Sequence, residues 1–324
     1  MSFIENIINR AKNNKKKIVL PESMDERVIS AAKIVRDRNI ADVILIGNLT
    51  DKDLYDIEII NPENSELTEQ FAVELYNLRK SKGMSIDEAR NILKTDYMYF
   101  ACMLVKKGYA DGVVSGACHS TANTLRPALQ IIKTKENVDL VSSFFLMIVP
   151  NCPFGNNGTF IFSDCGLEQN PTSERLATIA GTSAYSYKLL VEEEPFVALL
   201  SHSTKGSAKH FDVDKVINAT ELAKKRYPYF NIDGELQLDA AIVPEVAKNK
   251  APDSKVAGNA NVLIFPDLDS GNIGYKLVQR LANAEAYGPI TQGMASPIND
   301  LSRGCSIDDI VGVIAITCLQ VEEK

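Results

Sequence analysis

The sequence has no tryptophan, and only three histidines and six cysteines occur among its 324 residues. The cysteines form no C-x-x-C pair and have no regular spacing, so we predict free thiols rather than a disulfide framework or a zinc site. The histidines form no H-E-x-x-H pattern, so a motif common in zinc enzymes is absent. Free thiols are typical of a reducing compartment, and we therefore expect a cytoplasmic protein.

Long apolar runs are also missing. The longest lies near Phe144–Val149, whereas a helix that crosses a bilayer needs about 20 apolar residues. The lysines at positions 15 to 17 follow no apolar segment of the kind that a signal peptide has. The net charge is −7, which is opposite in sign to the footprint of a nucleic-acid-binding protein. We therefore expect neither a membrane nor a nucleic acid as a partner.

Two glycine-rich nucleotide-binding motifs are absent as well. No predicted strand is followed by G-x-G-x-x-G, which argues against a nicotinamide or flavin enzyme, and the loop S-T-K-G-S at 203–207 lacks the spacing of a P-loop. What is present, 45% hydrophobic and 24% charged residues, is ordinary for a globular enzyme. A chain of 324 residues exceeds the usual size of one hydrophobic core, so we predict two domains.

Apolar periodicity predicts an α/β protein made of two open α/β domains. In the first part of the chain, strands at 18–20 and 42–47 flank a helix at 26–38, which is the mark of a parallel sheet. Beyond residue 137 the alternation gives way to neighbouring strands at 138–149 and 158–163, joined by a turn. The remaining predicted strands lie at 110–115, 196–202, 236–243 and 262–265, and the remaining predicted helices at 67–80, 85–93, 96–107, 125–132, 173–190, 212–226 and 275–281.

One stretch, residues 288–310, gathers chemically useful side chains next to a predicted helix start at Ser306. Arg303 beside Ser302 at a helix N-terminus suits an anionic ligand. Ser306 and Asp309 have the spacing of a capping box, so Asp308 and Asp309 could instead only stabilise the helix, by about 0.3–1 kcal/mol each. The residues by themselves leave both interpretations of the stretch open.

A second polar stretch follows the predicted strand that ends at Ser115. Small hydroxyl and amide side chains fill the loop at 119–124, and Arg126 comes in the first turn of the helix expected after it. Free N–H groups, hydroxyls and one guanidinium are typical of a phosphate cradle. Alternatively, Thr121 or Thr124 is an N-cap and Arg126 a solvated side chain. These residues alone do not decide between the two.

Six segments together resemble the phosphate acetyltransferase (phosphotransacetylase) family. They extend over nearly the whole chain: YNLRKSKGMSIDEAR at 76–90, ADGVVSGACHSTANTLRPALQIIKT at 110–134, SHSTKGSAKHFD at 201–212, ELQLDAAIVP at 235–244, NVLIFPDLDSGNIGYKLVQR at 261–280 and GPITQGMASPINDLSRGCSIDDIV at 288–311. Each segment alone is weakly diagnostic, and all six in order are highly specific.

The resemblance implies a reversible reaction in which acetyl phosphate and coenzyme A give acetyl-CoA and phosphate, with no cofactor and no metal. It implies a homodimer whose subunits are similar to the isocitrate/isopropylmalate dehydrogenase-like fold, with the site in a cleft between the domains. In that fold domain I is discontinuous, and we expect it to comprise residues 1–137 plus 292–324. Domain II would then comprise residues 138–291.

The family's functional residues can be transferred onto matching positions. Asp309 matches the proposed base, Arg126 the arginine that faces the phosphoryl group, and Arg79 a further active-site arginine. The family's Ser-Arg pair is matched by Ser302 and Arg303, and Thr121 and Thr124 lie beside Arg126 in the sequence. Asn259 stands where relatives often have Lys or Arg, so we assign it no role in coenzyme A binding.

Other functions and another mechanism remain to be weighed. A phosphate butyryltransferase would share the scheme and differ in its acyl pocket. A nicotinamide-dependent hydroxyacid oxidoreductase of related fold would need a carboxylate cluster for a metal, and a non-catalytic regulatory domain would normally follow a dehydrogenase module; neither feature is evident in the sequence. A covalent route through Cys152 or Cys305 is chemically possible because thiols accept acyl groups well, but neither cysteine has a histidine in a local motif.

Overall fold

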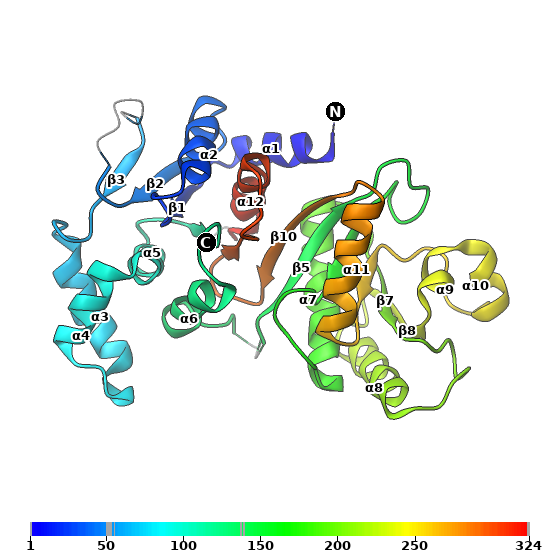
Figure 1. Cartoon of the computed structure of the whole chain (residues 1–324). Coiled ribbons are helices and arrows are strands. Elements are labelled where there is room, and N and C mark those ends of the chain that lie inside the picture. Colours follow the sequence, from blue (N-terminus) through cyan, green and yellow to red (C-terminus); the bar gives the residue numbers. More distant parts are fainter. Residues whose placement is uncertain (1, 50–53, 55, 137, 139, 323–324) are drawn as a thin grey trace. The chain divides into compact units, whose positions relative to one another are not determined.

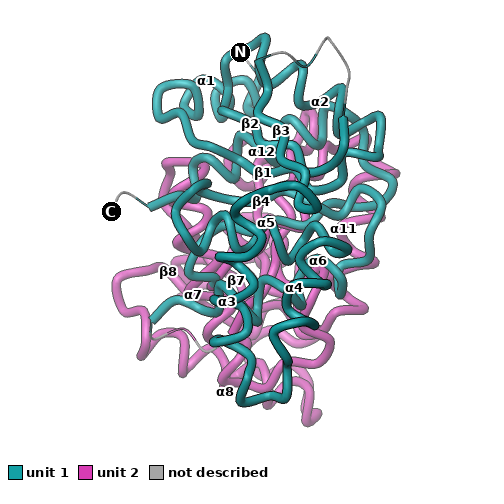
Figure 2. Tube along the Cα trace, turned by 90° about the vertical axis from the view of Figure 1, so that its left-hand side faces the viewer, with its two compact units in different colours: residues 1–137, 294–324 teal, residues 138–293 magenta. Residues whose placement is uncertain are grey.

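The computed structural model describes the chain except residues 1, 50–53, 55, 137, 139 and 323–324. Two compact units divide it, one made of residues 1–137 and 294–324 and the other of residues 138–293 (Figure 2). Each unit has its own β-sheet with helices packed on it (Figure 1). Among the described residues, no helix combines the length and the apolar character that a bilayer crossing requires.

Unit 1 contains a five-stranded sheet in the order β11-β4-β1-β2-β3. All of its neighbouring strands are parallel, which confirms the predicted parallel sheet. Its central strands are short and buried, as the runs of valine, isoleucine and leucine require. The strands are β1 (Lys17–Leu20), β2 (Asp42–Ile46), β3 (Glu58–Ile60), β4 (Gly112–Ser115) and β11 (Ile298–Asp300).

Helices pack on this sheet in two groups, since α12 contacts α1 and α2 whereas α5 contacts α6; α3 and α4 pack on each other. Helix α5 is strongly apolar, and its residues 98–105 are all buried. The bounds are α1 (Phe3–Asn13), α2 (Glu26–Asp37), α3 (Leu67–Arg79), the 3₁₀ turn η2 (Lys80–Lys82), α4 (Ile86–Thr95), α5 (Tyr97–Lys106), α6 (Thr121–Ile131) and α12 (Ile307–Gln320).

Two helix starts in unit 1 test the sequence analysis. The predicted start at Ser306 is confirmed, because Ser306 is the N-cap of α12. The expected start of α6 at residue 125 is wrong, because the helix begins at Thr121. The Ser120 hydroxyl accepts a hydrogen bond from the N–H of Asn123, and this cap turns the polar residues that follow Ser120 into the first helical turn.

Unit 2 contains a six-stranded mixed sheet in the order β10-β5-β6-β9-β7-β8. The predicted strands at 138–149 and 158–163 form an antiparallel pair, β5 and β6; residue 139 of that prediction lies outside the described residues. Strand β10 adds to β5 in the antiparallel sense, and the other pairings are parallel. The bounds are β5 (Ser142–Ile148), β6 (Thr159–Ser163), β7 (Phe196–Leu200), β8 (Asn231–Leu236), β9 (Val262–Ile264) and β10 (Glu285–Gln292).

Helices α7, α8 and α11 lie against this sheet, with α7 and α8 packed on each other and α11 in contact with β5, β6 and β10, whereas α10 packs on α9 (Figure 1). Tyr275 of α11 stacks on Phe145 of β5, with ring centroids 3.8 Å apart. The bounds are α7 (Ser173–Val191), α8 (Phe211–Arg226), α9 (Leu238–Ile242), α10 (Pro244–Lys250) and α11 (Leu268–Leu281).

Two predictions in unit 2 are wrong. The expected strand at 236–243 is mostly helix α9, and the strand beside it, β8, ends at Leu236. Strand β8 escaped prediction because it carries Asp233, a buried residue whose charge is compensated by Lys205 at 2.7 Å and Lys224 at 2.6 Å. The helix expected at 275 begins at Leu268, where the Asp267 side chain caps it.

Candidate functional site

Three neighbouring strands of unit 1 lead into polar turns at one edge of the sheet. Strands β1, β4 and β11 are parallel neighbours, so their carboxyl ends lie together. The turns after them lead to the starts of α2, α6 and α12, whose N-caps are Asp25, Ser120 and Ser306. Helix N-termini present free N–H groups and a partial positive charge. This edge is therefore suited to an anion. The turns after β4 and β11, together with the helices α6 and α12 that follow them, carry all the predicted site residues except Arg79.

Glu22, which follows β1, fixes the turn after β4. Its buried carboxylate accepts backbone N–H bonds from Gly116 and Ala117 at 2.8 Å, from Cys118 at 3.1 Å and from His119 at 3.0 Å. The Nδ1 of His119 lies 2.6 Å from the same carboxylate. Burial by itself raises the pKa of Glu22, but the bonds from His119 and the backbone outweigh it and hold this pKa below its ordinary value. The turn is thus built around an ionised carboxylate.

The same cluster must be considered as a metal site. Glu22, Cys118 and His119 are, among the described residues, the group whose possible ligand atoms all lie within 4.8 Å of one another. A metal would have to displace the N–H groups that already bind the Glu22 oxygens. It would also need the Cys118 thiolate, and partial burial together with the Glu22 charge raises the pKa of that thiol to about 12. The donor set therefore fits a hydrogen-bonded cluster better than a metal centre.

Arg27, in the first turn of α2, joins three turns. Its Nη1 donates to the carbonyl oxygens of Arg303 at 3.0 Å and Cys305 at 2.9 Å. Its Nη2 donates to the carbonyl oxygen of Ala117 at 2.8 Å and to the carboxylate of Asp25 at 2.7 Å. A guanidinium has five donors in a rigid fork, and here it uses them to hold the turns after β4 and β11 in fixed register.

The turn after β11 exposes the predicted Ser-Arg pair. The N–H of Cys305 donates to the carbonyl oxygen of Ser302 at 2.9 Å, which closes the turn. The side chains of Ser302 and Arg303 are exposed to solvent, although the backbone that carries them is held by Arg27. A hydroxyl and a guanidinium are therefore presented to solvent from a fixed backbone.

Asp309 has the capping geometry that the sequence suggested. The N–H of Ser306 donates to Oδ2 of Asp309 at 2.8 Å, and the N–H of Asp309 donates to Oγ of Ser306 at 3.1 Å. The capping interpretation is therefore confirmed. The hydrogen bond from Ser306 occupies one carboxylate oxygen of Asp309. It does not test whether the other oxygen takes part in chemistry, so the catalytic role of Asp309 stays a prediction.

The start of α6 meets the end of β11. Oγ1 of Thr121 donates to Oδ2 of Asp300 at 2.6 Å, and Asp300 itself is buried. Burial raises the pKa of Asp300 to about 6, although the hydroxyls of Thr121 and Thr124 lower it. The two predicted threonines thus surround a carboxylate two residues before Ser302.

The charges of Arg126 and Arg79 both act on Tyr99. Burial and the nearby Asp96 raise the pKa of Tyr99, and the charges of Arg126 and Arg79 act against that rise. The Tyr99 hydroxyl donates to Oε1 of Gln130 at 3.0 Å. The Arg126 side chain is exposed, so its guanidinium is open to a ligand.

Unpartnered buried atoms concentrate in this region. In the described part of the chain, four buried side-chain atoms lack a hydrogen-bond partner, and three of them are Nε of Arg79, Oγ1 of Thr124 and Oδ1 of Asp300. Each such atom costs about 1–3 kcal/mol of folding free energy. Unsatisfied buried groups are rare and call for an explanation, such as a missing water or ligand. Two of the three belong to predicted site residues.

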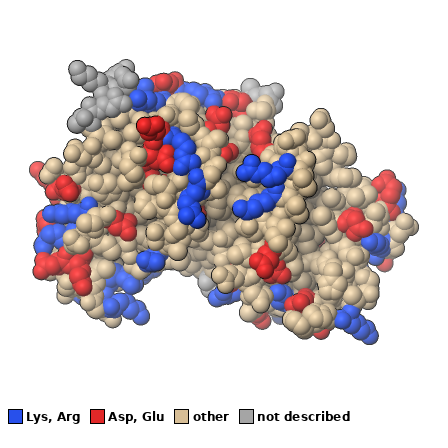
Figure 3. All heavy atoms as spheres, viewed as in Figure 1, with Lys and Arg blue, Asp and Glu red and all other residues tan. Residues whose placement is uncertain are grey.

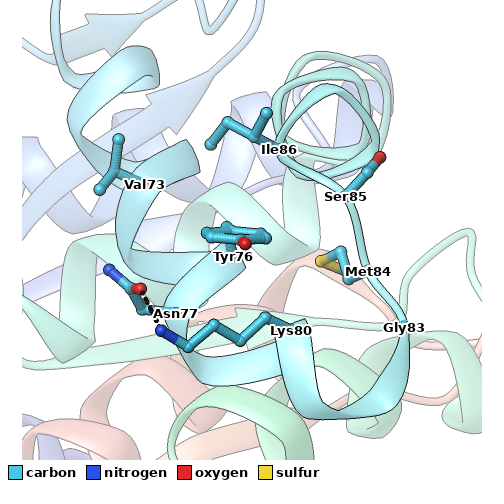
Figure 4. Close-up of a pocket in the computed structure, with 8 residues that line it drawn as sticks. All are labelled: Val73, Tyr76, Asn77, Lys80, Gly83, Met84, Ser85 and Ile86. Carbon is cyan, nitrogen blue, oxygen red and sulfur yellow. Dashed lines mark hydrogen bonds between the residues drawn. The ribbon is translucent and has the colours of Figure 1, made fainter.

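A groove of unit 1 lies elsewhere. It has a volume of about 720 Å³ and lies between α3 and the start of α4, where Lys80 donates to Asn77 at 3.1 Å (Figure 4). Its lining is Val73, Tyr76, Asn77, Lys80, Gly83, Met84, Ser85 and Ile86. None of these is a predicted site residue. The lining includes one cation, Lys80, and the start of one helix, α4, whereas three helix starts lie together at the edge described above. We therefore place the site at the sheet edge.

Acidic and basic side chains are interspersed over the face seen in Figure 3.

Four residues of this region were not predicted from the sequence: Glu22, Arg27, His119 and Asp300. A signal was available for two of them, because Glu22 follows a predicted buried strand by two positions and Asp300 directly precedes Leu301 and the Ser-Arg pair. The roles of Arg27 and His119 depend on contacts between distant segments, which local patterns do not reveal.

Comparison with known proteins identifies the family. The family model described as phosphate acetyl/butaryl transferase matches residues 2–318. The phosphate acetyltransferase of Acetivibrio thermocellus is 60% identical over an alignment that covers 99% of each chain. That of Thermoanaerobacterium thermosaccharolyticum is 57% identical over 99% of this chain and 100% of its own.

Solved structures agree with this result. A phosphotransacetylase from Streptococcus pyogenes superposes with a TM-score of 0.91 at 44% identity, over 99% of both chains. The EutD phosphotransacetylase from Staphylococcus aureus has a TM-score of 0.88 at 43% identity, over 98% of this chain and 99% of its own. The chain therefore belongs to the phosphate acetyl/butaryl transferase family.

Proposed function

We propose that this chain is a phosphate acetyltransferase, which interconverts acetyl phosphate and coenzyme A with acetyl-CoA and phosphate. The observation that supports this most strongly is the 60% identity to a phosphate acetyltransferase over 99% of both chains. The polar sheet edge of unit 1 adds the chemical groups that such a reaction needs. We propose no cofactor and no metal, with coenzyme A acting as a substrate.

The phosphate group of acetyl phosphate would bind at the start of α6. The free N–H groups of this helix and the exposed Arg126 guanidinium suit a phosphate, which a guanidinium can bind through two parallel hydrogen bonds. Arg79 would add a second positive charge, and its buried Nε has no partner within the described chain. Thr121 and Thr124 would line the same place.

The thiol of coenzyme A would be activated at the start of α12. A simple thiol has a pKa near 8.5 and is mostly protonated at neutral pH, so a base is required. Asp309 is the base that we propose, with Oδ2 retained by Ser306 and the other oxygen free to take the proton. Ser302 would hydrogen-bond the sulfur, and Arg303 would stabilise the developing negative charge on the substrate.

The acyl-chain preference can be tested directly, because the family description covers both acetyl and butyryl transfer. We expect thioester formation from coenzyme A to be fastest with acetyl phosphate, slower with propionyl phosphate and slowest with butyryl phosphate. The control is Arg303→Gln, which should lose activity with all three. A preference for butyryl phosphate would favour a phosphate butyryltransferase, and no thioester from any of the three would overturn the proposal.

We also propose that the chain works in the cytoplasm as a homodimer. The six cysteines are free thiols, which suits a reducing compartment.

The surface proposed for the dimer lies on α11. Ile273, Leu277 and Leu281 form an apolar stripe along this helix, and they are 58%, 53% and 79% exposed. A second copy would cover such a stripe. Light scattering should give a dimer mass that Leu277→Glu reduces to a monomer, whereas Val73→Glu on α3 should leave the mass unchanged. A monomer mass for the unchanged protein would contradict the dimer.

A further inference from the structure

The hydrogen bond between Thr121 and Asp300 limits what Thr121 can do. The Thr121 hydroxyl donates its one hydrogen to Oδ2 of Asp300 at 2.6 Å. Asp300 is only 1% exposed, and when ionised it can only accept hydrogen bonds. The oxygens of a phosphate dianion also only accept. While Asp300 is ionised, Thr121 therefore has no hydrogen left to donate to a bound phosphate group.

Protonation of Asp300 reverses this bond. A carboxylic acid would donate from Oδ2 to Oγ1 of Thr121, and the Thr121 hydroxyl hydrogen would then be free to turn toward a ligand. We propose that binding of a phosphate group at the start of α6 takes up one proton, which Asp300 holds while Thr121 donates to the phosphate. Asp300 thereby acts as a positioning residue through Thr121. This inference rests on the phosphate site proposed above.

Protons are conserved in this step. The phosphate dianion and one proton from solvent enter, the proton stays on Oδ2 of Asp300, and both leave when the ligand dissociates. No covalent bond other than the one to this proton changes, and neither oxidation nor reduction takes place.

The surroundings of Asp300 make this protonation accessible near neutral pH. Burial raises the pKa of Asp300 to about 6, and the Glu22 charge adds to this rise. The hydroxyls of Thr121 and Thr124 and the N–H of Leu301 act in the opposite direction. The ionised Glu22, on the turn after β1, is a titratable group of a neighbouring element whose charge acts on Asp300. An incoming dianion would raise the pKa of Asp300 further, because like charges disfavour each other's ionised form.

The unpartnered atoms point to the same conclusion. Oδ1 of Asp300 and Oγ1 of Thr124 are buried, and neither has a hydrogen-bond partner of good geometry within the described residues, although the Thr124 hydroxyl is near enough to lower the pKa of Asp300. A carboxylate that only tied the turn after β11 to α6 would be expected to have both oxygens satisfied. The carboxyl group is therefore held by less than a full set of partners, which suits a group that changes its protonation state.

Calorimetric titration with sulfate tests the proposal. Sulfate is a suitable probe because it stays doubly charged from pH 5.5 to 8.5, whereas phosphate itself takes up a proton in this range. Buffers with different ionisation enthalpies report the number of protons taken up. We expect an uptake approaching one proton per sulfate at pH 8, and an affinity that falls about tenfold per pH unit above pH 6.

Matched variants assign the proton. Asp300→Asn places an amide donor where the acid would be, so sulfate affinity should become independent of pH and, at pH 8, at least about tenfold tighter than in the unchanged protein. Thr121→Val should weaken binding and remove the proton uptake, and Thr121→Ser should keep both. Asp308→Asn removes an exposed carboxylate of α12 and should keep the full pH dependence.

Three results would overturn the inference: the same pH dependence in Asp300→Asn as in the unchanged protein, no proton uptake in any buffer, or no measurable sulfate binding. Since the titration needs no turnover, these results are independent of the assay for the proposed enzyme activity. A chain without acetyltransferase activity that still took up the proton would contradict the proposed function and support this inference.

Discussion

Ser306 and Asp309 hold each other's backbone N–H groups at the start of α12, at 3.1 and 2.8 Å. Asparagine can still accept the bond from Ser306, so Asp309→Asn should cost less than about 1 kcal/mol of stability. If the carboxylate is also the base, kcat should fall by about 10²–10⁴, the usual contribution of positioned proton transfer. Steady-state kinetics and a thermal melt, measured on the same preparation, separate the two roles.

The control for that substitution is Asp308→Asn, which removes an exposed carboxylate from the same helical turn and should leave kcat nearly unchanged. The residual rate of Asp309→Asn should rise with pH as free thiolate replaces base-assisted attack. Near-normal turnover combined with a lowered melting temperature would return Asp309 to a purely structural role.

Arg126 should act on one substrate only. Arg126→Gln should raise KM for acetyl phosphate by one to two orders of magnitude and leave KM for coenzyme A nearly unchanged, because a charge-assisted contact of about 1.5–3 kcal/mol is lost. Arg126→Lys should restore only part of the lost affinity for acetyl phosphate, since an ammonium cannot form the planar fork. Arg90→Gln, which breaks exposed ion pairs on α4, is the control. An equal rise in both KM values would show that Arg126 is not part of the phosphate site.

Arg27 should matter through the turns that it joins. Lysine cannot reach the carbonyl oxygens of Arg303, Cys305 and Ala117 at once, so Arg27→Lys should lower kcat at least about tenfold although Arg27 need not touch a substrate. Loss of one such bond also costs about 1.5–3 kcal/mol of stability. Urea unfolding and initial rates check both effects, with Arg38→Lys, at the C-cap of α2, as the control. An unchanged kcat would show that the turn after β11 keeps its shape without Arg27.

The Glu22 carboxylate should make stability depend on pH. Its pKa is lowered in the folded chain, so its stabilising contribution is complete above the ordinary glutamate pKa of about 4.3 and is lost as pH falls through the lowered value. At pH 7, Glu22→Gln should cost at least about 2 kcal/mol, because buried N–H groups lose an acceptor. The difference between the two proteins should shrink in urea unfolding at pH 3.5. A constant difference at both pH values would contradict an ionised Glu22, and the exposed Glu63→Gln should show no difference at either.

No covalent enzyme intermediate is expected at Cys305. Burial raises the pKa of its thiol to about 11, and the charge of Arg27 offsets this only in part. The thiol is therefore protonated at neutral pH and is a poor nucleophile. Initial-rate plots in which both substrates are varied should intersect, and Cys305→Ala and Cys152→Ala should both keep turnover. Parallel lines in these plots, together with loss of turnover in either cysteine variant, would establish the covalent route.

The periodic elements could be predicted from the sequence, and the polar interior could not. The start of α12 was predictable because Ser306 and Asp309 act within one turn. Strand β8 was not, because its buried Asp233 is compensated by Lys205 and Lys224, which lie outside the strand, 28 and 9 positions earlier. Asp300 was not predicted for the same reason, because its hydrogen bond comes from Thr121, which lies 179 positions earlier. Pattern analysis detects a charged residue but not the distant partner that allows it to be buried.

The carboxylate of Glu22 has a consequence for where a substrate can lie. In doubly wound sheets the ligand usually occupies the crevice where the strand order reverses, and in unit 1 that reversal lies between β1 and β4. Four backbone N–H groups there, which could cradle a phosphate, are already bound to Glu22. The protein thus carries its own anion at the topological switch point. A substrate phosphate is excluded from that crevice by charge, and we expect it one strand further along, between β4 and β11, displaced by about 4.8 Å.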